Sequence, residues 1–267
     1  MNRIHAFEFL DMSWYPGVFR QIQTDYLQFA ASFGSGHRNL ILLIQKAMVI
    51  AGTNQIVDLC SGSAGPWRGL LKQFHEKGIQ LHITLSDKYP QEDVVNKWQN
   101  DESGLITYFP DSVDATEVPI QLKGMRTLFE GFHHFQPTNA QKILKNAKES
   151  GEPIGIFDAS IKTPWGWLLL ILSPLITILT YLLITPFIKP RTFSRFLWTY
   201  ILPIVPLATC WDGVISLLRV YSPEALLELV EPLQSKDYVW QAGTASTETP
   251  VFDFTYLIGY PLKTSDK

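Results

Sequence analysis

The sequence predicts an α/β fold built around a mostly parallel sheet of seven strands. Short runs of apolar and β-branched residues alternate with helical patterns along most of the chain. A loop rich in Gly and Ser follows the first of these runs, as at the ligand-binding edge of open parallel sheets. The last two runs have no helix between them, so they can pair as an antiparallel hairpin. A chain of 267 residues is long enough to bury a core of this size.

The elements follow one another in a regular order. Apolar residues at three-to-four spacing predict two helices over 16–52, interrupted at Gly34-Ser35-Gly36. Strands are expected over 55–60, 81–87, 105–109, 124–132 and 153–159, and helices over 67–77 and 139–149 among their connections. A helix over 222–233 begins with Ser222 as its cap and Pro223 at its first position, before strands over 237–243 and 251–260. Helices on both faces of such a sheet make a Rossmann-like arrangement.

Composition narrows the classes of function. Apolar residues make up 46% and charged residues 18%, so the apolar excess must be local. A formal charge of -3, with scattered Lys and Arg, argues against nucleic acid as a partner. Cys60 and Cys210 are far apart and form no CxxC or metal-ligand pattern, which fits a reducing compartment. The first sixteen residues lack the apolar core of a secretory signal, so we expect a cytoplasmic catalytic domain.

One stretch departs from the α/β pattern. Residues 167–188 carry no charge over 22 positions, which is long enough to cross a bilayer, and a second apolar stretch over 196–211 contains Pro203 and Pro206. We therefore expect a hydrophobic helical hairpin, inserted after the fifth strand over 160–212, that associates with a membrane through residues 165–211. The remainder, 1–159 and 213–267, is expected to form one domain, with 1–52 as its N-terminal helical part.

The way this insertion meets a membrane has three possible forms. The strands on either side of it belong to one sheet, so the number of complete passes must be even. Two passes would put cations on the far side, against the positive-inside tendency, and the second arm is short. A hairpin that dips into the interface is favoured, while two passes or a soluble lid over an apolar pocket stay open. The expected headgroup contacts are Trp165, Trp167, Trp198, Trp211, Lys189, Arg191 and Arg195.

The loop after the first strand is the first candidate site. It reads Asp58-Leu59-Cys60-Ser61-Gly62-Ser63-Ala64-Gly65-Pro66. Small residues allow close backbone approach, and the following helix offers unpaired N–H groups to a polar ligand. A tight turn needed only for packing is the alternative.

This run resembles motif I of the class I S-adenosylmethionine-dependent methyltransferases, which is an acid followed by Gly-x-Gly-x-Gly. Cys60 stands where the first glycine is usual and Ala64 near the third, while Gly62 and Gly65 supply close approach. The resemblance covers the chain in element order except 160–212. It implies S-adenosyl-L-methionine as cofactor, held by Asp58, Cys60, Ser61, Gly62 and Gly65.

The resemblance also assigns roles to later residues. Asp87, at the end of the second strand, is expected to accept from the ribose hydroxyls, with Lys88 beside it. Asp114 and Ala115, after the third strand, would meet the adenine, although either acid could instead cap a turn. Phe129-Glu130-Gly131-Phe132-His133-His134-Phe135 resembles the motif IV region, which faces the transferred methyl group, and Glu130 is counted with the cofactor site.

Methyl transfer requires few catalytic side chains. Methyl transfer is an in-line displacement, and an oxygen or nitrogen acceptor that carries a proton needs a base. His133 and His134 are the candidates, although either could be structural, the sequence does not choose between them, and a carbon or sulfur acceptor needs neither. HExxH and Cys/His ligand sets are absent, so the sequence suggests no metal.

The resemblance thus implies a methyltransferase acting on a small, lipophilic acceptor at a membrane. One alternative is a non-catalytic scaffold held at a membrane, in which the altered glycines mark lost catalysis. A nicotinamide-dependent reductase shares the fold but fits less well, because GxGxxG and Tyr-x-x-x-Lys are absent.

Overall fold

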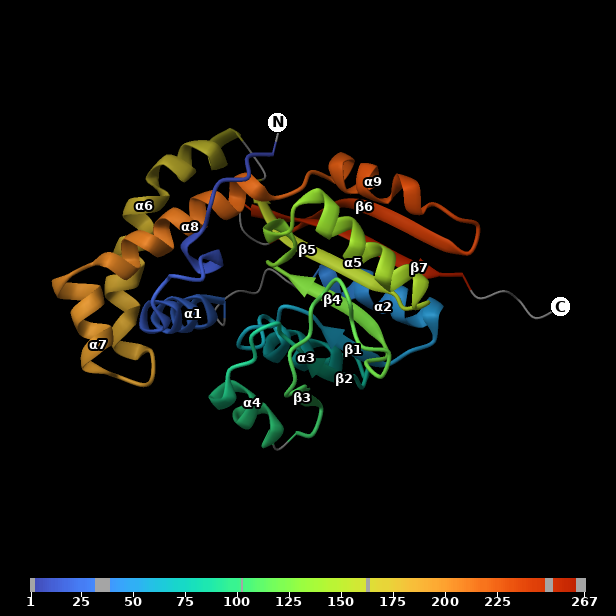
Figure 1. The fold of residues 1–267 in the computed structure, drawn as a ribbon, viewed down its shortest axis with the longest axis horizontal. Helices are drawn as coiled ribbons and strands as arrows, with labels where there is room; N and C mark the ends of the chain where they lie inside the picture. The colour runs from blue at the N-terminus through green and yellow to red at the C-terminus, as the bar shows by residue number, and fades with distance from the viewer. Residues whose placement is uncertain (1–2, 32–38, 102, 162–163, 248–251, 263–267) are drawn as a thin grey trace.

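The computed structural model describes residues 3–31, 39–101, 103–161, 164–247 and 252–262. A seven-stranded sheet in the order β3-β2-β1-β4-β5-β7-β6 forms its centre (Figure 1). Its strands are β1 (Gln55–Asp58), β2 (His82–Leu85), β3 (Ile106–Tyr108), β4 (Met125–Phe129), β5 (Ile154–Ile161), β6 (Tyr238–Ser246) and β7 (Phe252–Pro261). Neighbours among β1 to β5 are parallel, whereas β7 runs antiparallel to both β5 and β6. The predicted mostly parallel sheet and closing hairpin are confirmed.

Helices cover both faces of this sheet. The core on one face draws on α2 (Leu40–Ala51), α3 (Trp67–Glu76) and α4 (Glu92–Gln99). The core on the other draws on α5 (Pro137–Glu149) and α9 (Pro223–Val230), which η5 (Glu231–Leu233) follows. The Ser222 side chain accepts from the backbone N–H of Ala225, so the predicted N-cap is present. The predicted interruption at 34–36 lies outside the described residues.

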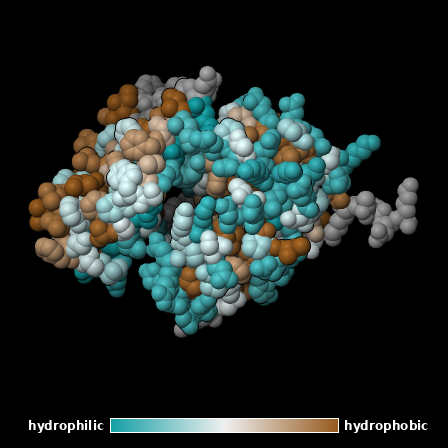
Figure 2. All heavy atoms as spheres, in the orientation of Figure 1, coloured by the Kyte–Doolittle hydropathy of each residue, from teal (hydrophilic) through white to brown (hydrophobic). Residues whose placement is uncertain are grey.

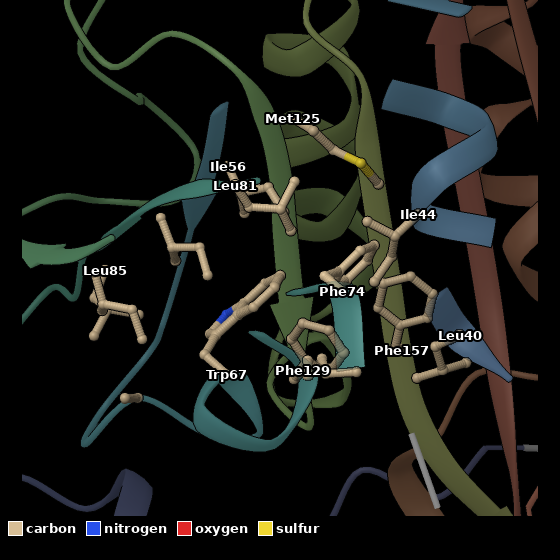
Figure 3. Packing of buried hydrophobic residues seen from close by; sticks show 14 of the residues in the cluster. Leu40, Ile44, Ile56, Trp67, Phe74, Leu81, Leu85, Met125, Phe129 and Phe157 are labelled. Atoms are coloured by element: carbon tan, nitrogen blue, oxygen red, sulfur yellow. The ribbon is translucent and has the colours of Figure 1, made fainter. Parts of the chain in front are cut away.

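The strongest packing lies beneath the carboxyl ends of the central strands (Figure 3). The ring centroids of Phe129 and Phe157 are 4.9 Å apart, and those of Trp67 and Phe129 are 5.4 Å apart, edge to face. All residues of β4 and the first five of β5 are buried, as expected for parallel strands covered on both faces. The rings therefore fix the start of α3 against the ends of β4 and β5.

The segment after β5 forms a helical lobe with the N-terminal helix α1 (Gly17–Ala31). It comprises α6 (Pro164–Ile184), η3 (Thr185–Phe187), α7 (Phe193–Phe196), the π-helix η4 (Leu197–Ile201) and α8 (Ile204–Arg219). The lobe has its own small core, in which the rings of Tyr26 and Tyr181 stack 3.9 Å apart. An N-terminal segment, residues 3–16 with η1 (Phe9–Asp11), runs along α8.

The lobe differs from a simple two-armed hairpin. The second arm bends at Leu202 and Pro203, and α8 continues past the expected boundary at residue 212. Buried polar side chains in its second half, Asp212 and Arg219, bind the N-terminal segment, so this part packs on the body of the protein. Across the described ranges no single helix combines the length and apolar composition needed to cross a membrane, whereas Phe193–Ile201 and Ile204–Arg219, bent by 72°, pass that test as a pair.

Gly124, which leads into β4, allows a test of the central sheet. Its φ is +125°, and a Cβ there would lie 2.5 Å from the backbone oxygen of Gln55. We expect Gly124→Ala to lower the free energy of unfolding by about 3 kcal/mol, because backbone strain and a backbone clash add. Gly151 has a φ of +68° and open space around its Cβ position, so Gly151→Ala should cost only about 1 kcal/mol. Equal losses in urea unfolding would contradict this account.

Candidate active site

The loop between β1 and α3 keeps a glycine-like backbone. Cys60, Gly62, Ala64 and Gly65 have φ values of 56°, 50°, 97° and 47°. Cys60 and Ala64 therefore adopt the left-handed region at the positions where the resemblance expects glycine. Each non-glycine residue there costs about 1–2 kcal/mol, and strain of this kind is concentrated at functional sites. The backbone shape of the loop persists although two of its expected glycines are replaced.

Asp87 fastens this loop to the end of β2. Its Oδ2 accepts from the backbone N–H of Gly62 at 3.0 Å, and its Oδ1 accepts from the N–H of Tyr89 at 2.9 Å. The Tyr108 hydroxyl donates to the carbonyl of Gly62 at 3.1 Å. Each carboxylate oxygen keeps a further lone pair, so Asp87 can still accept from a ligand beside the loop.

Asp58 and Ser61 brace the loop from inside the sheet. The Asp58 carboxylate accepts from the Thr127 hydroxyl at 2.6 Å, and burial raises its pKa to about 6. The Ser61 hydroxyl donates to the Asp58 carbonyl at 2.8 Å and accepts from the N–H of Ser86 at 3.2 Å. Asp58 thus acts on the site through the shape of the loop, with its carboxylate bound inside the sheet.

Lys88 and Asp114 form a pair next to Asp87. The Lys88 ammonium lies 2.8 Å from Asp114 Oδ2, and the other Asp114 oxygen accepts from the N–H and hydroxyl of Thr116. The pKa of Asp114 is lowered to about 2, and the hydrogen bond from Lys88 makes the largest contribution to this shift. Ala115, the next residue in the chain after Asp114, is buried. The structure therefore brings Asp87, Lys88 and Asp114 together at one edge, as the order of strands predicts.

His133 has the surroundings of a catalytic base. It lies in η2 (Phe132–His134), just after β4, and only 3% of it is exposed. Its Nδ1 is 3.1 Å from Oδ1 of Asp158 on the adjacent strand β5. Burial alone would lower its pKa, but the Asp158 carboxylate outweighs burial, so the pKa of His133 is raised. Its Nε2 is buried, lies 4.0 Å from Glu8 Oε1 and has no hydrogen-bond partner among the described side chains and backbone, so this nitrogen retains a lone pair when the ring is neutral.

His134 is held differently. Its Nδ1 lies 2.9 Å from Asp11 Oδ1 and 3.7 Å from Glu8 Oε2, both in the N-terminal segment, and 3.3 Å from Nη1 of Arg219. Its ring is thus part of an ionic cluster that attaches this segment to the body. The geometry favours His133 over His134 as the base.

Glu130 borders the same site. Its backbone has a φ of +52°, and both carboxylate oxygens lie 3.1 Å from the N–H of Ala159. Its side chain is exposed to the cavity, where reduced hydration and the nearby Asp158 carboxylate raise its pKa. Glu130, His133 and Asp158 offer ligand atoms within 4.8 Å of one another, so they could also hold a metal ion. The sequence pattern suggests no metal, because these ligands come from two strands and form no contiguous motif.

A cavity of about 560 Å³ joins these elements. Its floor contains Ser61, Ser63 and Gly65 of the loop together with Glu130 and His133. Its roof comes from the N-terminal segment, α1 and α8, and the apolar residues of its wall are Leu10, Leu27, Pro66, Phe129, Ala159, Leu217 and Phe252. Part of the loop and the segment after β4 therefore share one mostly apolar cavity. The other predicted cofactor residues are not among its lining residues: Asp58, Cys60, Gly62, Asp87, Lys88, Asp114 and Ala115.

Sequence reasoning missed several residues around this cavity. Asp158 closes the apolar run PIGIFD, which is the same signal that selected Asp87, so it could have been found. Glu8, Asp212 and Arg219 belong to segments more than 200 residues apart, and Glu8 and Asp212 line the cavity. Nothing in their local sequence indicates this.

The fold, but not the sequence, is similar to that of known proteins. No protein-family model matches the chain, and no curated protein does. The structure of the plantazolicin methyltransferase BpumL in complex with SAH is similar over 94% of each chain, with 11% identity and a TM-score of 0.55.

Two further solved structures are less similar. An O-methyltransferase from neocarzinostatin biosynthesis, in complex with S-adenosylmethionine and a naphthoic acid, has 13% identity and a TM-score of 0.48. That match covers 92% of this chain and 59% of the other. A putative zinc-dependent alcohol dehydrogenase from Rhodobacter sphaeroides has 11% identity and a TM-score of 0.49 over 91% and 98% of the two chains. Over 94% of both chains, this protein therefore has the fold of the methyltransferase BpumL.

Proposed function

We propose that this protein is an S-adenosylmethionine-dependent methyltransferase that acts on a small, lipophilic acceptor. One observation carries the proposal: residues of the left-handed loop after β1 line the same cavity as His133, whose imidazole is paired with Asp158. The similarity of fold to BpumL supports it. In this proposal the loop holds the cofactor and His133 is the base, the two components that methyl transfer to an oxygen or nitrogen requires.

The loop after β1 and the acids beside it are suited to bind S-adenosyl-L-methionine. A Cβ at Gly62 or Gly65 would meet no atom within 4 Å, so there is open space beside the loop at both positions. Asp87 would accept from the ribose hydroxyls, and Asp114 with Ala115 would border the adenine. Bound S-adenosyl-L-methionine supplies an electrophilic methyl group on its sulfonium sulfur.

The role of the protein side chains is to hold the acceptor and to move its proton. His133 Nε2 takes the proton from the acceptor atom, and the Asp158 carboxylate stabilises the imidazolium that forms. The roof of α1 and α8 keeps water from the reacting atoms. The apolar wall of the cavity favours an acceptor with a substantial apolar part.

The outer surface of the lobe supports membrane association. Figure 2 shows hydrophobic side chains gathered over α6, α7 and α8, whereas the sheet body is mainly hydrophilic. The largest exposed ones are Ile171, Leu175, Leu179, Leu183, Phe187, Phe193, Ile201 and Leu207. A patch of this extent is unusual for a monomer in water and is typical of an interaction surface. We propose that the lobe lies on the cytoplasmic face of a bilayer, from which the acceptor enters the cavity.

The predicted headgroup residues have mixed surroundings. Lys189, Arg191 and Trp211 are exposed at the lobe surface. Arg195 is buried in a pair with Asp25, and Trp198 packs against Phe19 with ring centroids 4.8 Å apart. The side chains of Trp165 and Trp167 lie outside the described residues.

Cofactor binding tests the proposal. We expect S-adenosylmethionine and S-adenosylhomocysteine to bind in calorimetric titration, and Asp87→Ala to weaken both about 10- to 100-fold, because a charged acceptor is lost. Asp111→Ala, which removes an exposed acid from the same edge, should have no effect. Binding of NADPH alone would favour the reductase, and binding of none of the three by the folded protein would favour the scaffold.

A further inference from the structure

A second cavity, of about 280 Å³, lies between α1, α3, α4 and the segment after η3. Three cations from separate elements line it: Arg68 of α3, Lys97 of α4 and Lys189 after η3. None of the three has an ion-pair partner within the described part of the chain. Converging cations without counterions favour an anionic ligand.

The acid in this cavity does not neutralise them. Asp25 pairs with the buried guanidinium of Arg195 and also accepts from the Gln21 side-chain amide at 2.9 Å. Arg195 in turn donates to the carbonyls of Ile188 and Pro190, at 3.0 and 2.8 Å, which holds the segment that carries Lys189. The pair thus positions Lys189 and leaves the other two cations free.

Trp98 organises Arg68 and Lys97. The Arg68 guanidinium lies 4.7 Å from the Trp98 ring centre, and the Lys97 ammonium lies 5.6 Å from it. Trp98 is only 1% exposed, and its indole N–H has no hydrogen-bond partner among the described residues. Burial and the neighbouring Arg68 lower the pKa of Lys97, as expected for cations held close together. A rigid ring therefore holds two cations at one wall.

The start of α3 adds to the positive field. Gly65 and Pro66, just before this ten-residue helix, also line the cavity. The helix dipole places partial positive charge at this end, where anions bind favourably. An Arg fork, two ammonium groups and a helix N-terminus together suit a compact, multiply charged oxyanion better than a single carboxylate.

We propose that this cavity is a binding site for a phosphate group. The group has two possible sources, a phospholipid headgroup or a soluble phosphate. Lys189 follows the exposed Phe187 on the lobe surface, so a bilayer against the lobe would present headgroups near it. The soluble source needs no membrane. The site shares Gly65 with the proposed cofactor loop, but its three cations are distinct from His133, Asp158 and Asp87, so the two proposals can fail separately.

The test uses the full chain and two probes. Binding of inorganic phosphate is measured by calorimetry without lipid. Binding to phosphatidylcholine vesicles is measured by co-sedimentation, with and without phosphatidic acid at roughly a fifth of the lipid, which is enough to create a negative surface potential. We expect Arg68→Gln with Lys97→Gln to lower the affinity for the phosphate group at least about tenfold, and Lys189→Gln alone to lower it about threefold. Lys142→Gln, on α5 across the sheet, removes an exposed cation elsewhere and should change neither.

The outcomes separate the sources. Binding of inorganic phosphate that the double variant loses supports a soluble ligand, whereas an effect confined to phosphatidic acid vesicles supports a headgroup. Binding to pure phosphatidylcholine should be unchanged in all variants, because it reports the apolar surface. If the double variant bound both probes like the unmodified chain, or if that chain bound neither, the proposal would be overturned. Loss of S-adenosylmethionine binding in Lys189→Gln would instead assign the cations to the cofactor site and also overturn it.

Discussion

Replacing His133 with alanine is expected to lower kcat about 10²- to 10⁴-fold, the range by which a positioned base accelerates proton transfer. Cofactor affinity should stay within about twofold, because the polar partners of His133 are Asp158 and Glu8 rather than residues of the loop. Asp158→Asn should cost less than His133→Ala, since the imidazole remains but loses the carboxylate that orients it. His75→Ala, an exposed histidine on α3, is the matched control.

The pH profile gives a second readout of the same pair. If His133 is the base, catalysis requires its neutral form, and Asp158 raises the pKa of His133 above the ordinary value of 6.5. The kcat/KM value should therefore rise with pH and reach its plateau only above that raised pKa. In Asp158→Asn the midpoint should move to lower pH, because the charge that favours the imidazolium is gone. A merely structural histidine would leave the midpoint unchanged.

Treatment with a chelator distinguishes two possible roles of His133, a general base and a metal ligand. The same three groups, Glu130, His133 and Asp158, could hold a cation. If His133 is the base, activity should survive treatment with EDTA. A loss that a divalent cation restores would assign His133 to a metal site and contradict the prediction.

The sheet could be predicted because its signals are local. Apolar runs mark the strands, Ser222 and Pro223 mark the start of α9, and the absence of a helix between the last two strands predicts their pairing. The strands are shorter than their apolar runs where the run continues into a loop, as after Asp58. Apolar residues in such loops pack on the same core, so hydrophobicity alone does not mark the end of a strand.

The site was predictable only where it lies at the ends of strands. Asp87 and Asp114 were expected to be neighbours because parallel strands β2 and β3 end at one edge. The choice between His133 and His134 depends on partners from elsewhere: Asp158 on β5 for one, Glu8 and Asp11 for the other. The local sequence of the two histidines contains nothing that distinguishes these partners. The packing of α8 was equally hard to predict. Its apolar first half suggests a membrane segment, whereas the buried ionic groups that attach it to the body lie in its second half.

Arg219→Met is expected to lower the free energy of unfolding by about 3–5 kcal/mol, the usual cost of removing one partner of a buried ion pair. Arg219 is 2% exposed, and its Nη1 lies 2.9 Å from Glu8 Oε1 and 2.6 Å from Asp11 Oδ2. Its Nε also donates to the carbonyl of Ala6 at 2.7 Å. The arginine therefore joins α8 to the N-terminal segment that roofs the cavity. Its loss leaves the buried Glu8 without its arginine partner, with only the more distant imidazoles of His133 and His134 beside it.

The pH dependence of the destabilisation by Arg219→Met tests whether the buried Glu8 carboxylate causes it. Burial already raises the pKa of Glu8, and without the arginine it should rise further, so Glu8 takes up a proton as the pH falls. The destabilisation measured in urea should consequently be smaller at pH 5 than at pH 8. Adding Glu8→Gln to Arg219→Met should recover part of the loss, because the unpaired charge is removed. Arg191→Met, which removes an exposed arginine, should cost less than about 0.5 kcal/mol. A similar cost for both arginines would mean that the buried cluster contributes little to holding the segment over the cavity.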